Sequence, residues 1–351
     1  MPSQRAEPVT FYSDGLRLTG TLYLPADDQN DPDAPDTLDA PGGRGGPAPA
    51  VVLCAGWVGG KYHRAPAFAA GFTSRGIALL SFEYRGWGES EGDRTKLWPE
   101  EQVTDVRAAV SYLRQRPDID GGRIALFGKE HGSAVATKAA ADDPAVMALI
   151  CMFPVGDCAR WMRSIRRPWE WRELLATIEG DRAQRCVTGV SGHIDPSDVL
   201  LVDPATEERR RDKRARAVEF AEWKLRIDSA EALLAFRPVD SAYRLAPRPV
   251  LFIAVENDNT VPVEEAMAFY SALPGPRKLI LLRGIEHYAA YEPEYLTPAL
   301  ESAARYLRAA FGGEPAAEAG QEISLIGVPS PNAAMFSTTW PYMTRKLSSL
   351  T

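Results

Sequence analysis

Short apolar runs alternate with helical patterns along most of the chain, and this alternation restricts the fold more than any other feature. A hairpin comes first, with strands Val9–Tyr12 and Leu16–Tyr23 around an Asp14-Gly15 turn. Buried-strand runs follow at 50–55, 77–83, 123–127, 146–153, 249–255 and 278–282. Helical patterns lie at 66–75, 99–116, 131–141, 264–272 and 295–311. This order predicts a mostly parallel sheet flanked by helices on both faces.

The alternation stops between Val155 and Arg237, where long helical patterns replace it. We therefore expect one core in two parts, residues 1–154 and 239–312, with residues 155–238 inserted as a helical lid. The polar residues 313–351 are expected to form a tail that either docks on the body or stays disordered.

Two further segments are biased in composition. Residues 26–48 are rich in Asp, Pro and Gly and lack periodicity, which indicates an exposed, mobile insertion. The basic run at 209–214 follows two glutamates. We interpret it as a solvated helix face rather than a nucleic-acid or targeting patch.

Composition narrows the class of protein. A net charge of -7 argues against a dedicated nucleic-acid binder, which would carry a basic surface. No apolar run is long enough for a transmembrane helix, and no secretory signal is evident. The cysteines show no CxxC spacing and no paired framework; they are Cys54, Cys151, Cys158 and Cys186. We expect a cytoplasmic protein in a reducing compartment that binds neither nucleic acid nor membrane.

The segment Gly128-Lys129-Glu130-His131-Gly132 carries the strongest chemical signal. It follows a strand and opens a helix rich in small residues, as the G-x-S-x-G nucleophile elbow does. Glycines at both ends permit the tight turn, and the apex residue is pushed into the pocket. Here the apex is Glu130 instead of serine.

Two partners follow in the order that such a site requires, first the acid and then the base. Asp258 follows the strand at 249–255, and His287 follows the strand at 278–282. Loops at the carboxyl ends of parallel strands converge on one crevice, so Glu130, Asp258 and His287 can meet there. A carboxylate beside histidine fixes its tautomer and stabilises the imidazolium.

Two other loops adjoin this crevice. The segment from Cys54 to Gly60 follows the first parallel strand, and its backbone can supply one donor of an oxyanion hole. Trp57 and His131 are the candidate donors. The run from Tyr84 to Ser90 needs its glycines for a tight connection and is interpreted as architectural.

Over residues 8–311 the chain resembles the α/β-hydrolases, in the branch of dienelactone-hydrolase-like esterases, Xaa-Pro-peptidase-like hydrolases and fungal polyketide-tailoring hydrolases. The segments that carry the resemblance are 53–57, 84–90, the elbow, 258–262 and 284–287. The resemblance implies an α/β-hydrolase fold and hydrolysis of an ester, thioester, lactone or related carbonyl bond. By position it implies a Glu130–His287–Asp258 triad.

Glutamate at the apex departs from the family pattern, and three mechanisms compete. Glu130 can attack carbon, with His287 activating water to cleave the ester intermediate; family members with aspartate at the apex open epoxides this way. Glu130 can instead be a general base in a hydrolase, lyase or cyclase, aided if burial raises its pKa. In the third reading Glu130 only pairs with His287, and the protein is a non-catalytic ligand binder. Ser133, three residues further on, is no obvious substitute nucleophile.

The expected substrate is a hydrophobic small molecule with an ester, thioester, lactone or epoxide bond. Aromatic residues in and around the lid suggest an apolar ligand, although most would serve the lid's own core; they are Phe153, Trp161, Trp169, Trp171, Trp223, Phe236 and Tyr243. No metal is expected, because no histidine, cysteine or carboxylate cluster has the spacing of metal ligands. No organic cofactor is expected, because no P-loop or GxGxxG motif is evident. A homodimer is compatible with the sequence.

Overall fold

The computed structural model describes residues 5–26, 46–57, 64–201, 208, 223–312 and 322–326. Almost all of the expected insertion at 26–48 and all of the basic run at 209–214 lie outside these ranges. His63, one of the chain's four histidines, also lies outside them.

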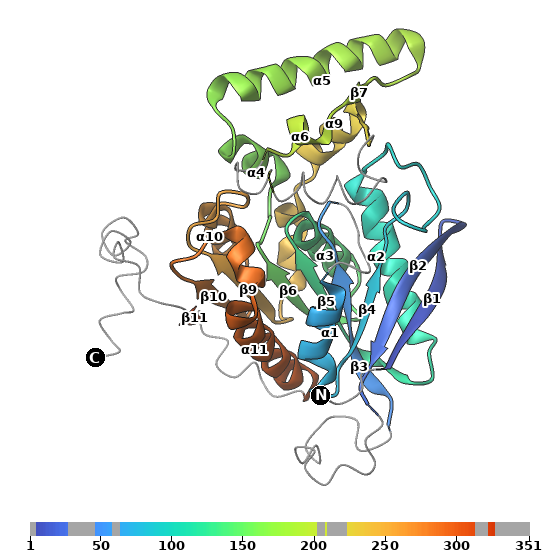
Figure 1. Ribbon diagram of the computed structural model, residues 1–351, viewed down its shortest axis with the longest axis vertical. Coiled ribbons are helices and arrows are strands. Elements are labelled where there is room, and N and C mark those ends of the chain that lie inside the picture. Colours follow the sequence, from blue (N-terminus) through green and yellow to red (C-terminus); the bar gives the residue numbers. More distant parts are fainter. Residues whose placement is uncertain are drawn as a thin grey trace.

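One nine-stranded sheet organises the molecule, in the order β1-β2-β4-β3-β5-β6-β9-β10-β11 (Figure 1). Its strands are β1 Arg5–Ser13, β2 Leu16–Leu24, β3 Ala48–Cys54, β4 Ala78–Phe82, β5 Ile119–Lys129, β6 Val146–Met152, β9 Val250–Val255, β10 Arg277–Leu282 and β11 Glu322–Ile326. β1 and β2 pair antiparallel, as do β2 and β4, while the pairs from β4 through β3 to β11 are parallel. The predicted mostly parallel sheet is confirmed.

The helices pack on both faces of the sheet because its central strands are apolar on both sides. Every residue of β4 and of β9 is buried. Helices α1 (Ala65–Thr73) and α11 (Pro293–Gly312) contact each other, as do α2 (Pro99–Arg114) and α3 (His131–Asp142). The remaining core elements are α10 (Val263–Ala272) and the short helices η2 (Pro238–Leu245) and η3 (His287–Tyr291).

The stretch between β6 and β9 begins with helices that lie above the sheet (Figure 1). These are α4 (Cys158–Ser164), α5 (Pro168–Thr188), α6 (Pro196–Val199) and α9 (Ile227–Ala235). A two-stranded antiparallel ribbon, β7 (His193–Ile194) with β8 (Leu225–Arg226), joins this segment, and the helical patterns had not predicted it. Glu265 of α10 ties the segment to the core, because its carboxylate accepts hydrogen bonds from the backbone of Gly156 and Asp157 and from Arg160.

Part of the expected tail belongs to the sheet. Residues 322–326 form β11, which pairs parallel with β10 from Lys278 to Leu282. The sequence left docking and disorder open for the tail, and it did not predict this strand. The polar composition of residues 313–321 and 327–351 hides the short apolar pattern of Ile323, Leu325 and Ile326.

Candidate active site

The turn between β5 and α3 holds Glu130 in an unusual backbone conformation. Its φ of 54° and ψ of -130° lie where a residue with a side chain is strained. The backbone N–H of Glu130 donates to the carbonyl of Met152 at 2.9 Å, which ties the turn to β6. Side chains at Gly128 or Gly132 would collide with backbone, Gly128 with the Gly132 carbonyl and Gly132 with the Ala55 carbonyl. The turn therefore needs both glycines and places the apex side chain beyond the strand ends.

His287 and Asp258 come together at the ends of β10 and β9. Asp258 Oδ2 accepts a hydrogen bond from His287 Nδ1 at 2.7 Å. Its other oxygen, Oδ1, accepts from the backbone N–H groups of Thr260 at 2.8 Å and Val261 at 2.7 Å. Both side chains are buried, with 1% of Asp258 and 3% of His287 exposed. Asp258 is thereby fixed, and it fixes the imidazole in turn.

A second carboxylate holds the two loops in register. Glu256 Oε2 accepts a hydrogen bond from the backbone N–H of Gly284 at 2.8 Å. The backbone N–H of Asn257 donates to the carbonyl of Ile285 at 3.2 Å. These bonds join the segment that carries Asp258 to the segment that carries His287.

The two oxygens of the Glu130 carboxylate have different surroundings. Oε1 lies 3.3 Å from His287 Nε2 and accepts a hydrogen bond from the hydroxyl of Tyr291 at 2.8 Å. Oε2 lies against Gly56, so closely that a Cβ at position 56 would be 2.5 Å from it. The Glu130 side chain keeps 24% of its surface exposed, which leaves the carboxylate within reach of a ligand.

The site holds Glu130 and His287 as an ion pair. Burial alone would raise the pKa of Glu130, but the hydrogen bond from His287, the charge of Lys129 and the Tyr291 hydroxyl hold it well below its ordinary value. Burial opposes the charge on His287 as well. The carboxylate of Asp258 and its hydrogen bond, with that to Glu130, raise the pKa of His287 to about 9. At neutral pH the histidine is therefore an imidazolium that donates to both carboxylates.

Aromatic rings enclose this ion pair. The ring of Tyr291 has Phe153 5.5 Å away on one side and the guanidinium of Arg64 4.1 Å from its centroid. The ammonium of Lys129 lies 5.3 Å from the same ring, and burial lowers its pKa. These neighbours exclude water from one side of the carboxylate and add positive charge close to it.

The structure places the other candidate residues as follows. His131 is fully buried and its Nε2 pairs with Gln102 Oε1 at 2.7 Å, so its side chain supports α2 and α3. Burial lowers the pKa of His131 to about 3, which keeps the ring neutral. Trp57 is buried and directly follows Gly56, the residue against which Glu130 Oε2 lies. The backbone donor roles of Trp57 and His131 stay predictions.

The hydroxyl of Ser133 has a structural role, because it links the elbow turn to the segment after β6. It donates to the carbonyl of Glu130 at 2.6 Å and accepts from the backbone N–H of Val155 at 2.8 Å. The loop from Tyr84 to Ser90 is built around Glu83, whose Oε2 accepts from the backbone of Glu89 at 2.9 Å. Both observations agree with the sequence interpretation, which assigned neither segment to chemistry.

The aromatic residues in and around the expected lid differ in their burial and in their contacts. Trp161 is fully buried and its Nε1 donates to the carbonyl of Thr260 at 2.7 Å, beside the Asp258 loop. Trp223 packs edge-on against Trp87. Trp169 is 50% exposed, and Tyr243 is 61% exposed next to Arg244, away from the carboxylate cluster. Tyr243 thus does not line the site, because η2 turns its side chain outward.

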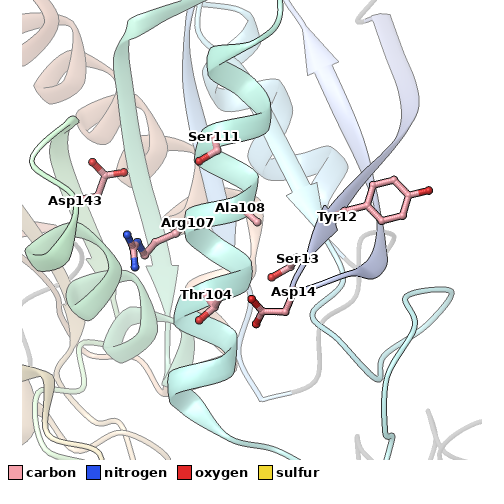
Figure 2. A pocket seen from close by; sticks show the side chains of 8 residues that line it. All are labelled: Tyr12, Ser13, Asp14, Thr104, Arg107, Ala108, Ser111 and Asp143. Carbon is pink, nitrogen blue, oxygen red and sulfur yellow. The ribbon is translucent and has the colours of Figure 1, made fainter.

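A surface pocket of about 320 Å³ lies elsewhere, between the β1–β2 hairpin and α2 (Figure 2). Its lining residues are Tyr12, Ser13, Asp14, Thr104, Arg107, Ala108, Ser111 and Asp143. Ser13 and Asp14 both accept hydrogen bonds from Arg85, which itself pairs with the buried Asp105. Figure 2 shows Tyr12 directed away from α2. Ser13 and Asp14 of this pocket thus help to attach the hairpin to the core through Arg85.

Within the described residues, no group of three or more histidine, cysteine, aspartate or glutamate side chains could hold a metal ion. No helix in the same part of the chain is long and apolar enough to cross a membrane. All four cysteines are free, three of them buried and Cys186 exposed.

Sequence reasoning missed Tyr291 and gave no role to Lys129. Tyr291 lies four residues after His287 in His-Tyr-Ala-Ala-Tyr, so one helical turn brings its hydroxyl to the same carboxylate. The spacing is visible in the sequence, but nothing there shows that a short helix forms. Lys129 is adjacent to the apex, and only the turn geometry shows that its charge reaches Glu130.

Comparisons with known proteins agree with this fold. The chain is 26% identical over 326 residues to the thiohydrolase aneE of Aspergillus aculeatus, covering 88% of this chain and 94% of that one. It is 24% identical over 251 residues to the polyketide transferase grgF of a Penicillium species, covering 68% and 81% of the two chains. Among solved structures, that of DcsB in complex with its substrate analogue superposes with a TM-score of 0.71 at 20% identity, covering 88% of this chain and all (100%) of that one.

A family model gives the assignment. The family described as serine aminopeptidase, S33, matches residues 45–294, which includes the elbow, Asp258 and His287. Those residues also hold the strands β3 to β10 on which the site is built. The chain belongs to this family of α/β-hydrolases, with glutamate where the family name implies serine.

Proposed function

We propose that the protein is a hydrolase that opens an ester, thioester, lactone or epoxide bond of a hydrophobic small molecule, with Glu130 as the nucleophile. One observation carries the proposal: a carboxylate, the pKa of which its neighbours lower, lies at the elbow apex in a hydrogen-bonded chain with His287 and Asp258. A carboxylate is a competent nucleophile, and the neighbouring acid and base complete the set of groups that covalent hydrolysis needs.

In the first half-reaction the charged pair acts together. A Glu130 oxygen attacks the electrophilic carbon, and the bond from that carbon to the leaving oxygen or sulfur breaks. The leaving atom takes the proton from His287 Nε2, which lies 3.3 Å from Glu130 Oε1 in the resting state. Glu130 is now neutral as part of the intermediate, and His287 is a neutral imidazole held by Asp258.

In the second half-reaction water releases the product. Loss of the Glu130 charge lowers the proton affinity of His287, because that carboxylate was one of its two acidic partners. The neutral imidazole can then take a proton from water while the water oxygen attacks the intermediate. This proton passes to the departing product, and the second proton of the water moves from the Glu130 carboxyl to His287, which restores the ion pair.

The general-base alternative, as a lyase or cyclase, has less support. A carboxylate acts well as a base when its pKa lies near the working pH. The surroundings of Glu130 move its pKa in the opposite direction, well below the ordinary value. A non-catalytic ligand binder would not need an ordered histidine and aspartate beside the carboxylate. It would also gain nothing from the strained backbone at Glu130, which has a positive φ.

The nature of the substrate follows from the site and from the relatives. The thiohydrolase and polyketide transferase named above favour thioesters and related acyl groups of a polyketide kind. The carboxylate apex favours an epoxide, because attack on a saturated carbon gives a stable ester whereas attack on a carbonyl gives an anhydride. We further propose that residues 155–238 act as the lid that selects the hydrophobic part of the substrate.

A panel of aryl epoxides, lactones, esters and thioesters tests the function. The wild-type protein is compared with Glu130→Gln, Glu130→Ser and His287→Ala. We expect turnover by the wild type and a loss of about 10³-fold or more in Glu130→Gln. Single-turnover reaction in H₂¹⁸O should place ¹⁸O in the peptide that contains Glu130. Turnover that survives in Glu130→Gln, or ¹⁸O that enters only the diol when the substrate is an epoxide, rules the covalent function out.

A further inference from the structure

The two carboxylate oxygens of Glu130 are not equivalent. Oε1 is already occupied by two donors, the Tyr291 hydroxyl at 2.8 Å and His287 Nε2 at 3.3 Å. Oε2 faces the backbone at Gly56, where the absence of a side chain leaves room for it. Lone pairs that accept hydrogen bonds are poorer nucleophiles, so Oε2 is the attacking atom and Oε1 becomes the carbonyl oxygen of the intermediate.

We propose that Tyr291 is a catalytic residue of the second half-reaction, in which its hydroxyl stabilises the oxyanion that forms on Glu130 Oε1. This inference rests on the proposed covalent function and concerns epoxide substrates, where the intermediate is a hydroxyalkyl ester of Glu130. The expected oxyanion donor in the Trp57 loop stands apart from this role, because that loop adjoins Oε2 at Gly56.

The steps balance as follows. Oε2 bonds to an epoxide carbon, the ring C–O bond breaks, and the alkoxide takes the His287 proton. Water then loses a proton to His287 and bonds to Glu130 Cδ, and the Cδ–Oε1 double-bond electrons move onto Oε1. When this oxyanion collapses, the Cδ–Oε2 bond breaks and the departing diol oxygen takes the proton back. Glu130 keeps Oε1 and gains the oxygen of water, and the remaining proton of that water moves to His287.

Tyr291 is built to donate in this step. The residue is 6% exposed, and its ring packs against Phe153, Phe68 and Arg64, which fix the direction of the hydroxyl. Burial and the nearby Glu130 charge raise the pKa of Tyr291 well above its ordinary value, so the hydroxyl keeps its proton. A donor that is already in place at Oε1 needs no rearrangement when negative charge develops there.

Tyr291→Phe separates the two half-reactions. Excess enzyme is mixed rapidly with styrene oxide, and the mass of the intact protein is followed over time. We expect the covalent adduct to form at a rate within a few-fold of wild type and to decay about 10²- to 10³-fold more slowly. The adduct then accumulates on the peptide that contains Glu130. Tyr12→Phe, at a tyrosine of the hairpin that is 67% exposed, is the control for loss of a tyrosine hydroxyl and should leave both rates unchanged.

Three results overturn the proposal. Decay at the wild-type rate in Tyr291→Phe shows that the hydroxyl does not stabilise the oxyanion. An equal fall in formation and decay shows that Tyr291 only positions Glu130. Absence of any adduct in the wild type, together with full turnover by Glu130→Gln, removes the covalent function itself and the role of Tyr291 with it. Thermal unfolding of each variant confirms that the compared proteins are folded.

Discussion

The ring of Phe153 packs on the imidazole of His287 in a tilted arrangement, with centroids 4.0 Å apart and planes inclined by 32°. Phe153 itself has a φ of 53°, and its backbone N–H donates to the carbonyl of Ile253 at 2.8 Å. The strand end is therefore bent to place an aromatic face against the histidine. A ring in this position stabilises the imidazolium and limits its rotation.

Phe153→Leu should lower the pKa of His287 from about 9. Loss of a cation–π contact of about 0.5–2 kcal/mol corresponds to roughly 0.4–1.5 pKa units. Titration of the histidine ring protons by NMR measures the change. Phe269→Leu is the control, since Phe269 packs against Phe252 instead. An unchanged pKa of His287 in Phe153→Leu would show that the ring only fills space.

The rate of adduct formation should fall at high pH. The first half-reaction needs Glu130 ionised and His287 protonated, and the pKa of Glu130 lies well below its ordinary value. The rate is therefore level around neutrality and drops as His287 loses its proton at about pH 9. Single-turnover rates between pH 6 and 10.5 test this. Asp258→Asn, which removes the main partner of the imidazolium, should move the drop to lower pH.

Gly56→Ala should inactivate the protein without unfolding it. The new methyl group would lie 2.5 Å from Glu130 Oε2, and the flexible carboxylate can move away. A displacement of about 1 Å costs about 10²-fold in rate. Activity and thermal unfolding are measured on the same preparation. Gly180→Ala, on an exposed helix with no atom near the added methyl, controls for the substitution itself. Full activity in Gly56→Ala would contradict the placement of Oε2.

Glu265→Ala should destabilise the fold by about 3 kcal/mol. The Glu265 side chain is 2% exposed, and its removal leaves the backbone N–H groups of Gly156 and Asp157 and the charge of Arg160 without their acceptor. Urea denaturation measures the free energy of unfolding. Glu264→Ala, at the exposed neighbouring position, should change it by less than about 0.5 kcal/mol. Equal effects of the two variants would contradict the role of Glu265 as an anchor.

The core could be predicted from the sequence because its signals are local. Continuous apolar runs mark β3 to β6, β9 and β10, and the Asp14-Gly15 turn marks the hairpin. The same order of strands and loops predicted that Glu130, Asp258 and His287 lie together. Boundaries were less certain, and β5 begins at Ile119 rather than Arg123, next to an irregularity in its pairing with β3.

What the sequence could not predict depends on contacts between distant residues. The direction of the Glu130 pKa comes from Lys129, His287 and Tyr291 acting together against burial. The inequivalence of its two oxygens comes from Gly56 on one side and Tyr291 on the other. The distance between these residues along the sequence predicts neither the pKa direction nor the difference between the two oxygens, since each depends on how three separate loops are placed in the fold.

The pairing of β11 with β10 bears on how the protein behaves when it is produced. Without residues 322–326, β10 would present its unpaired backbone groups at the margin of the sheet, along a strand whose last four residues are buried leucines and isoleucine. Exposed apolar strands of this kind recruit other chains. A version ended after α11 would therefore be prone to aggregate, because β11 is the strand that covers this edge of β10.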